Sequence, residues 1–164
     1  MDTLSHALWG YGLFGHKPNG RKKLAKTALF FGAMPDLISF GIFFVMRVLQ
    51  GQWQPGPPPL ATIPDWLYFN YSLGHSFIIS FAVIGLIAIK NKDLAFAMLA
   101  WPFHIVLDFP FHSFKYFPTP IFWPLSDYKI DGIPWSHWYI WWPNVAGLVL
   151  LFAYRAKQKR KNSL

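Results

Sequence analysis

Two residues whose types could do chemistry lie one helical turn apart inside an apolar stretch. His104 and Asp108 fall within residues 94–111, where most of the other side chains are apolar. If this stretch is helical, both side chains lie on one face of the helix. They could chelate one cation, or the carboxylate could orient the imidazole for proton transfer. His112 continues the same interval, but Pro110 disfavours helix there, so we expect His112 just past the helix end.

Further ionisable residues occur in other apolar segments, namely His6, Asp36 and His75. A charged residue inside a membrane costs on the order of 2.5 to 3.5 kcal/mol on insertion scales, so such placements require a partner. The depth of each of these residues in the membrane can be estimated by counting residues from the nearest basic cluster, at about 1.5 Å per helical residue. This count places five residues in one slab roughly 10 Å thick: His6, Asp36, His75, His104 and Asp108. We therefore expect these five residues to converge.

Each of these residues also has a simpler interpretation. A lone buried histidine such as His6 or His75 is more often a hydrogen-bonded core residue than a ligand. Asp36 follows Pro35 and could merely cap a helix that begins at Leu37. His112 lies near a predicted helix end, where a surface role competes with ligation.

The donor types available to a metal ion are restricted. Cysteine is absent, and all 7 acidic residues are aspartates, so imidazole and aspartate carboxylate must supply the ligands. This set suits a divalent cation, with zinc the first candidate and manganese the second. The sequence contains no P-loop, GxSxG, HExxH or dinucleotide-binding motif, so these enzyme classes have no support.

The elements that must position these residues are indicated by the composition. Of the 164 residues, 54% are hydrophobic and 20% aromatic, and the mean hydropathy is +0.27. Charged residues make up 13%, against about 25% in a soluble domain. This is the composition of an integral membrane protein.

Most of the positive charge behind the net charge of +8 lies in three basic clusters, which hold 12 of the 15 lysines and arginines. They are Lys17, Arg21, Lys22, Lys23 and Lys26; Lys90 and Lys92; and Arg155, Lys157, Lys159, Arg160 and Lys161. Each cluster adjoins an apolar segment, which the positive-inside rule predicts for cytoplasmic loops. This reading is favoured over nucleic-acid binding, so we expect membrane lipids and no nucleic acid as partners.

The predicted fold is an all-α membrane bundle with four main transmembrane helices and a short N-terminal apolar helix. The four segments are residues 27–49, 66–89, 94–111 and 138–154, each near the roughly 17 to 25 residues that a bilayer requires. Residues 1–16 would form the short helix, which either spans or re-enters the membrane. Residues 1–154 would form one domain, and residues 155–164 a basic cytoplasmic tail. We expect this protein in the cytoplasmic (inner) membrane.

The order of several short motifs resembles that of a known family. The motifs are Ser5-His6 with Gly10, then Gly32-Ala33-Met34-Pro35-Asp36, then Gly74-His75-Ser76, then His104 with Asp108. Together they resemble the YdjM-like family of predicted membrane-bound metal-dependent hydrolases, over about residues 3–126. The order of the histidines and aspartates is also similar to that of zinc-dependent phospholipases C and P1-type nucleases, in which such residues bind metal around a phosphoester.

The resemblance implies a function and also shows where this chain differs. The family pattern has a second aspartate where this chain has Ile38, a His-Arg pair where it has Asn70 and Tyr71, and a threonine where it has Gly74. The leading hypothesis is a membrane-bound metal-dependent hydrolase that acts on a lipid-like substrate such as a phosphoester. The alternative is a non-catalytic membrane protein in which the same residues form an ion or proton path, or a structural polar network.

Roles follow for the individual residues under the hydrolase hypothesis. His75, His104 and Asp108 would be metal ligands, and His6 a fourth or second-metal ligand. Asp36 would be a ligand or the catalytic general base that removes a proton from water. His112 completes the candidate set as a further ligand.

Overall fold

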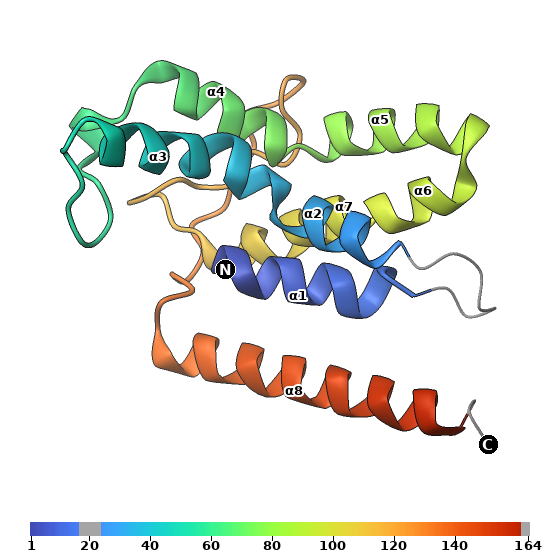
Figure 1. Cartoon of the computed structure of the whole chain (residues 1–164). Helices are drawn as coiled ribbons and strands as arrows, with labels where there is room; N and C mark the ends of the chain where they lie inside the picture. Colours follow the sequence, from blue (N-terminus) through green and yellow to red (C-terminus); the bar gives the residue numbers. More distant parts are fainter. Residues whose placement is uncertain (17–23, 162–164) are drawn as a thin grey trace.

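The computed structural model describes residues 1–16 and 24–161. Within these ranges the chain is helical and contains no β-strand, as predicted. Three helices meet at the centre of the molecule, α1 (Thr3–Phe14), α2 (Ala25–Asp36) and α7 (Ala100–Asp108), and the N-terminus of the chain lies beside them (Figure 1). Lys17, Arg21, Lys22 and Lys23 of the first basic cluster lie outside the described residues, as do residues 162–164 of the predicted tail.

Helices α1 and α2 pack closely because glycines lie where they cross. A Cβ atom on Gly32 would lie 2.5 Å from the carbonyl oxygen of His6, and one on Gly10 would lie 2.6 Å from that of Ala28. Small residues allow two backbones to approach this closely inside a membrane. The crossing brings the His6 turn of α1 against the segment that leads to Asp36.

Helix α2 continues without interruption through a π-helical turn, η1 (Leu37–Gly41), into α3 (Ile42–Leu49). Pro35 lies inside this continuous helix, and the Ser39 hydroxyl donates to its carbonyl oxygen at 2.8 Å. π-Helical turns inside α-helices are frequent at functional sites. Asp36 is the last residue before this turn. It therefore lies within a continuous helix and its side chain caps no new helix at Leu37, which excludes that alternative for Asp36.

The predicted span at residues 66–89 is broken. Helix α4 (Asp65–Gly74) and helix α5 (Phe77–Lys90) meet at a bend of 55°, with His75 at the break. Backbone groups freed inside a membrane need new partners. The Trp101 indole donates to the Gly74 carbonyl at 2.6 Å, and the Phe77 amide donates to a carbonyl in the later loop.

The helix that carries His104 and Asp108 ends where Pro110 predicts. Helix α6 (Lys92–Met98) leads into α7, and α7 ends at Asp108 in a short 3-10 turn over Phe109–Phe111. His112 follows in an extended conformation, just past the helix end as expected. The irregular segment 112–137 then folds back over α4 and buries Phe117 and Ile121.

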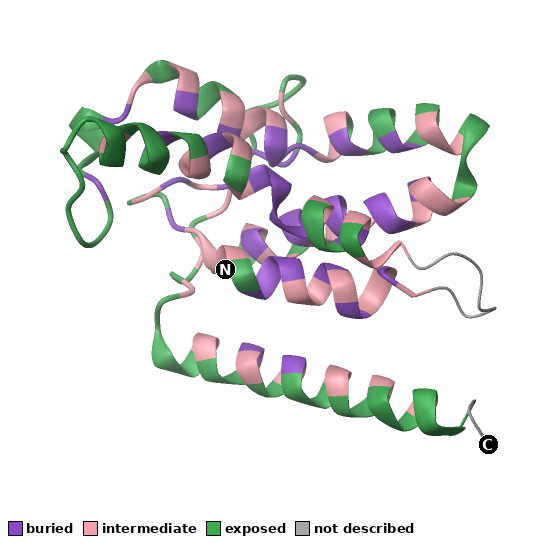
Figure 2. Cartoon of the chain, in the orientation of Figure 1, coloured by how far each residue is buried: buried purple, intermediate pink, exposed green. Residues whose placement is uncertain are grey.

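The last helix, α8 (Trp138–Lys161), lies alongside α1 (Figure 1). Its buried residues are Asn144 and Leu148, and most of the rest of its surface is exposed (Figure 2). The Arg155 guanidinium donates to the carbonyl oxygens of Gly12 and Leu13 at 2.8 and 3.2 Å. These two carbonyls in the last turn of α1 would otherwise lack a hydrogen-bond donor. Residues 155–161 of the predicted tail thus continue α8.

The prediction of four transmembrane helices is wrong for the residues that the structure describes. Two continuous helices, Ala25–Leu49 and Lys92–Phe111, are long and apolar enough to span a membrane, and the bent α4–α5 pair would make a third. Residues 138–154 do not qualify, because the first turns of α8 contain Pro143, Asn144 and several tryptophans, which dilute the apolar run. Helix α1, with 12 residues, is too short for a comfortable span.

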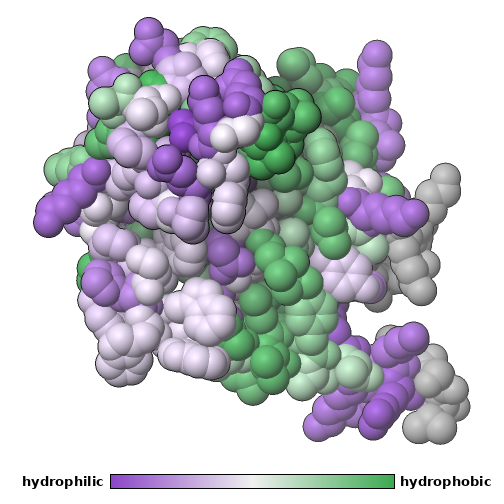
Figure 3. All heavy atoms as spheres, turned by 60° about the vertical axis from the view of Figure 1, so that its left-hand side comes forward, coloured by the Kyte–Doolittle hydropathy of each residue, from purple (hydrophilic) through white to green (hydrophobic). Residues whose placement is uncertain are grey.

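Large apolar side chains are exposed over much of the molecule, for example Val45, Leu49, Leu86, Ile89 and Val149. Figure 3 shows a strip of hydrophobic side chains that runs down the molecule beside a face where hydrophilic and weakly polar side chains predominate. Extensive exposed apolar surface of this kind is typical of contact with lipid. The start of α2, the α5–α6 turn and the end of α8 lie at the same end of the molecule (Figure 1). The described parts of the three basic clusters therefore share one end, as the sequence predicts.

Candidate metal centre

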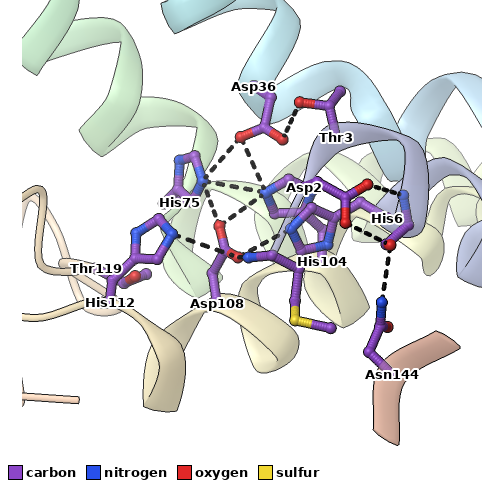
Figure 4. A network of polar contacts seen from close by, with 12 residues as sticks. Asp2, Thr3, His6, Asp36, His75, His104, Asp108, His112, Thr119 and Asn144 are labelled. Carbon is purple, nitrogen blue, oxygen red and sulfur yellow. Dashed lines mark hydrogen bonds and ion pairs between the residues drawn. The ribbon is translucent and has the colours of Figure 1, made fainter. Parts of the chain in front are cut away.

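The predicted histidines and aspartates converge on one point between α1, α2, the α4–α5 break and α7 (Figure 4). Asp36, His75, His104 and Asp108 each direct one donor atom there, and all four donor atoms lie within 4.8 Å of one another. The two histidines and Asp108 have fully buried side chains, and the Asp36 side chain is 14% exposed. We call these four residues the cluster. It has the donor types and the spacing to hold a metal ion.

The donor spacing is close to that of a tetrahedral coordination shell. Nε2 of His75 lies 3.2 Å from Oδ2 of Asp108 and 3.1 Å from Nε2 of His104. Nε2 of His104 lies 3.3 Å from the same Asp108 oxygen, and Asp36 Oδ1 lies 3.7 and 3.9 Å from the two imidazole nitrogens. Ligand bonds of about 2.0 to 2.1 Å in a tetrahedron correspond to ligand–ligand distances of about 3.3 Å. Asp36 Oδ1 lies farther out than the other three donors and would have to approach them to complete this arrangement.

Backbone carbonyls determine which imidazole nitrogens face the centre of the cluster. Nδ1 of His75 lies 2.9 Å from the carbonyl oxygen of Tyr71, and Nδ1 of His104 lies 2.7 Å from that of Gly32. A carbonyl only accepts hydrogen bonds, so this pattern assigns a proton to each Nδ1. In the neutral imidazoles both Nε2 atoms then carry lone pairs. Metal-binding histidines usually have such an outer hydrogen bond.

Asp36 is oriented by the helix that crosses it. The Thr3 hydroxyl donates to Oδ2 of Asp36 at 2.8 Å, which leaves Oδ1 directed toward His75 and His104. Thr3 is placed by the first turn of α1, where the Asp2 side chain caps the helix by accepting from the Ser5 amide at 2.8 Å. The alternative of ligand or cap for Asp36 is thus resolved in favour of a side chain that faces the cluster.

Two further predicted residues lie against the other oxygen of Asp108. Nε2 of His6 is 2.9 Å from Oδ1, and Nε2 of His112 is 3.7 Å from it. The Met1 amino group also contacts Oδ1. The structure therefore brings together every residue of the predicted set, including His112, which sequence reasoning placed near the surface as an alternative.

The His112 ring is held by a hydroxyl and carbonyl network. Its Nδ1 lies 2.7 Å from the Tyr71 hydroxyl and 2.9 Å from the Phe117 carbonyl oxygen, and the Tyr71 hydroxyl is 3.3 Å from that of Thr119. Burial lowers the pKa of His112 below its ordinary value, which favours neutral imidazole. Burial likewise raises the pKa of Tyr116 to about 12, so that nearby hydroxyl stays protonated.

A cavity of about 670 Å³ opens beside the cluster. Its polar side is formed by Asp2, Thr3, Asp36 and His112, and its apolar side includes Phe40, Phe44, Tyr116, Phe117 and Trp135. Neither lysine nor arginine occurs among the described residues that line it. Phe44 is 37% exposed on the outer surface, so the apolar side reaches the exterior of the bundle.

Sequence reasoning missed the residues that orient the cluster. Thr3, Tyr71 and the Gly32 carbonyl hold Asp36, His75 and His104, respectively. A signal existed for Tyr71, because it lies four residues before His75 and therefore one helical turn away. The other two contacts join residues more than 30 positions apart, and no local pattern reports them.

No family model matches this chain, and neither a curated protein nor a solved structure matches it.

Proposed function

We propose that this chain is a multi-pass protein of the cytoplasmic membrane and a hydrolase that depends on a divalent metal, zinc first and manganese second. The observation that carries the proposal is the convergence of four electron-pair donors on one buried point. Two imidazoles with their protons on Nδ1 and two carboxylates at this spacing need positive charge between them, which a metal ion or an added proton on Nε2 supplies. The motif order that resembles the YdjM-like family supports the same assignment.

A divalent cation at this point supplies Lewis-acid chemistry and makes water a nucleophile near neutral pH. His75, His104 and Asp108 would hold the cation, because their side chains are fully buried and mutually closest. Asp36 differs from them, since it is partly exposed and lines the cavity. We therefore assign Asp36 as the residue that borders the attacking water, either as a fourth ligand or as its general base.

The reaction that suits these groups is hydrolysis of an ester. The water oxygen forms a bond to the phosphorus or carbonyl carbon of the substrate, and the bond between that atom and the ester oxygen breaks. Asp36 accepts one proton from the water and returns it to the departing oxygen, which yields an acid and an alcohol. The aromatic wall of the cavity and its outer edge at Phe44 suit a substrate with an apolar chain.

One observation favours the alternative of a non-catalytic polar network. A hydrogen-bonded chain leads from Asp2 through Ser5 to Asn144 and the indole of Trp9, at 2.7, 2.8 and 2.7 Å. This chain joins α1 to α8, as a structural polar network would. The cluster, however, gathers around one point and is not strung across the bundle, which favours a metal site over a path.

The test measures bound metal and hydrolysis in the same samples. Full-length protein in detergent is loaded with Zn²⁺, freed of excess metal and analysed for zinc per chain. A double variant, His104→Ala with Asp108→Ala, is compared with a control, His137→Ala with Asp127→Ala. The control residues are of the same types but are exposed and lie outside the cluster.

We expect the wild type and the control to retain zinc and the cluster variant to lose it. Zinc-loaded protein should hydrolyse phosphoester or carboxylic ester substrates that carry an apolar chain. Protein from which a chelator has removed the zinc should not. Circular dichroism of every sample separates a lost site from a lost fold. Equal, near-zero zinc in well-folded wild type and cluster variant would refute the proposal.

A further inference from the structure

The two oxygens of Asp108 face different sets of groups. Oδ2 lies 3.2 Å from Nε2 of His75 and 3.3 Å from Nε2 of His104, within the cluster. Oδ1 lies 2.9 Å from Nε2 of His6 and 3.7 Å from Nε2 of His112. Figure 4 shows Asp108 with histidines on both sides. One buried carboxylate thus joins two separate groups of imidazole nitrogens.

One histidine from each side of Asp108 stacks on the other. The rings of His6 and His104 stack with centroids 3.6 Å apart and planes inclined by 25°. Each directs its Nε2 atom at a different oxygen of Asp108. A carboxylate that presents its two oxygens to two stacked ligands is suited to bridge two cations. Paired metal ions in hydrolytic sites lie about 3.5 to 4 Å apart, which is comparable to the separation of these rings.

The nitrogen of His112 that faces Oδ1 is available for ligation. Its Nδ1 contacts the Phe117 carbonyl and the Tyr71 hydroxyl, and this pattern assigns the proton to Nδ1. The lone pair of Nε2 is then directed to the Asp108 side. His112 has the outer hydrogen bond that metal-binding histidines usually have, as His75 and His104 do.

We propose that Asp108 bridges two divalent cations, one in the cluster and a second held by His6, His112 and Oδ1 of Asp108. This inference rests on the proposed function, because both sites share Asp108. Since the His112 side chain is 14% exposed and lines the cavity, the second cation lies on the side where substrate enters. There it would bind an anionic oxygen of the substrate, since the described cavity lining has no lysine or arginine and the Met1 amino group in that lining is paired with Asp108.

The second site binds its cation more weakly than the first. Nδ1 of His6 is buried and has no hydrogen-bond partner among the described residues, so it lacks the outer contact that the other three histidines have. Loss of such a contact typically lowers metal affinity 10- to 100-fold. The Met1 amino group also lies against Oδ1 and must move or lose its proton before a cation binds there.

The stoichiometry of Zn²⁺ binding tests this inference. Metal-free full-length protein in detergent is titrated with Zn²⁺ by calorimetry, and zinc per chain is measured independently by elemental analysis. We expect two zinc ions per wild-type chain, with the second bound at least about tenfold more weakly. His6→Ala and His112→Ala should each retain one tightly bound zinc, and the exposed His137→Ala control should retain two.

Loading with Mn²⁺ supplies a second measurement. Two bridged manganese ions give an exchange-coupled electron paramagnetic resonance spectrum, which the wild type should show and His112→Ala should not. A wild type that saturates at one zinc, unchanged in both histidine variants, would overturn the bridged site and leave the proposed function intact. Absence of zinc from a folded wild type would overturn both.

Discussion

At the scale of single residues, Asp108 organises the candidate site. Its side chain is fully buried, and its contacts join His6 and His112 on one oxygen to His75 and His104 on the other. A carboxylate in such surroundings is tolerated only when it is paired with cations or donors. Hydrogen bonds from groups outside the cluster decide which atom of each ligand faces the centre of the cluster. Residues that do not bind the metal should therefore still affect metal affinity.

Thr3 provides the first test at this scale. Substitution Thr3→Val removes the hydroxyl that donates to Oδ2 of Asp36 and keeps a similar shape. We expect the dissociation constant for the tightly bound Zn²⁺ to rise about tenfold, because loss of an outer contact frees the ligand to rotate. The control is Thr62→Val, whose hydroxyl bonds a backbone carbonyl in an exposed turn. Equal affinities in the two variants would show that Asp36 does not depend on Thr3.

At the scale of elements, the site depends on helices that are interrupted or unusually close. The π-helical turn follows Asp36, and the α4–α5 break places His75. The α1–α2 crossing at Gly10 and Gly32 brings His6 to Asp108. The carbonyl of Gly32 also accepts from His104, so this crossing supports two of the histidines. Stability and metal binding should therefore change together when the crossing is altered.

The substitution Gly32→Ala tests the crossing. The added Cβ would lie 2.5 Å from the His6 carbonyl oxygen, so α1 must move away from α2. We expect a loss of about 1 to 3 kcal/mol in the free energy of unfolding, as for other overpacked cores. Bound zinc should also decrease.

A matched glycine in α5 serves as the control. A Cβ on Gly85 would meet nothing within 4 Å, so Gly85→Ala should leave zinc unchanged and stabilise the helix by about 0.5 to 1 kcal/mol. Thermal unfolding in detergent, followed by circular dichroism, measures both variants. A Gly32→Ala protein as stable and as zinc-rich as wild type would contradict the role of the crossing.

At the scale of the whole molecule, charge and exposed apolar surface indicate how the chain would lie in a membrane. The described residues of the three basic clusters gather at one end, where α2 begins, α5 meets α6 and α8 ends (Figure 1). The loop at residues 51–65, which contains neither lysine nor arginine, connects α3 to α4. By the positive-inside rule the basic end would be cytoplasmic and this loop would lie on the opposite side.

The absence of cysteine from the sequence makes this orientation directly testable. Single cysteines are introduced as Gln54→Cys in the loop and Lys157→Cys near the end of α8. A membrane-impermeant maleimide is applied to cells whose inner membrane is intact and reachable from outside. It should label the cysteine at position 54 and should label the cysteine at position 157 only after the inner membrane is disrupted. Labelling of both positions from outside would place α8 on the outer side and contradict a cytoplasmic C-terminus.

Much of the candidate site was predictable from the sequence because its rules are local. The interval between His104 and Asp108 places them on one helical face, and Pro110 ends the helix before His112. The high cost of burying charge predicts that His6, Asp36 and His75 meet this pair. All-helical structure likewise follows from the apolar composition, since backbone groups in a membrane must pair within a helix.

The tertiary structure alone decided the rest, because it depends on contacts between distant segments. The hydropathy of the sequence does not reveal that the span near His75 is broken. Nor does it reveal that α8 lies alongside α1 with much of its surface exposed. Nor does it reveal that His112, beyond the helix end, returns to Asp108 through the loop that contains Phe117. The sequence thus determined which residues need a shared partner. Their placement on the two oxygens of Asp108 was decided by how closely the helices cross.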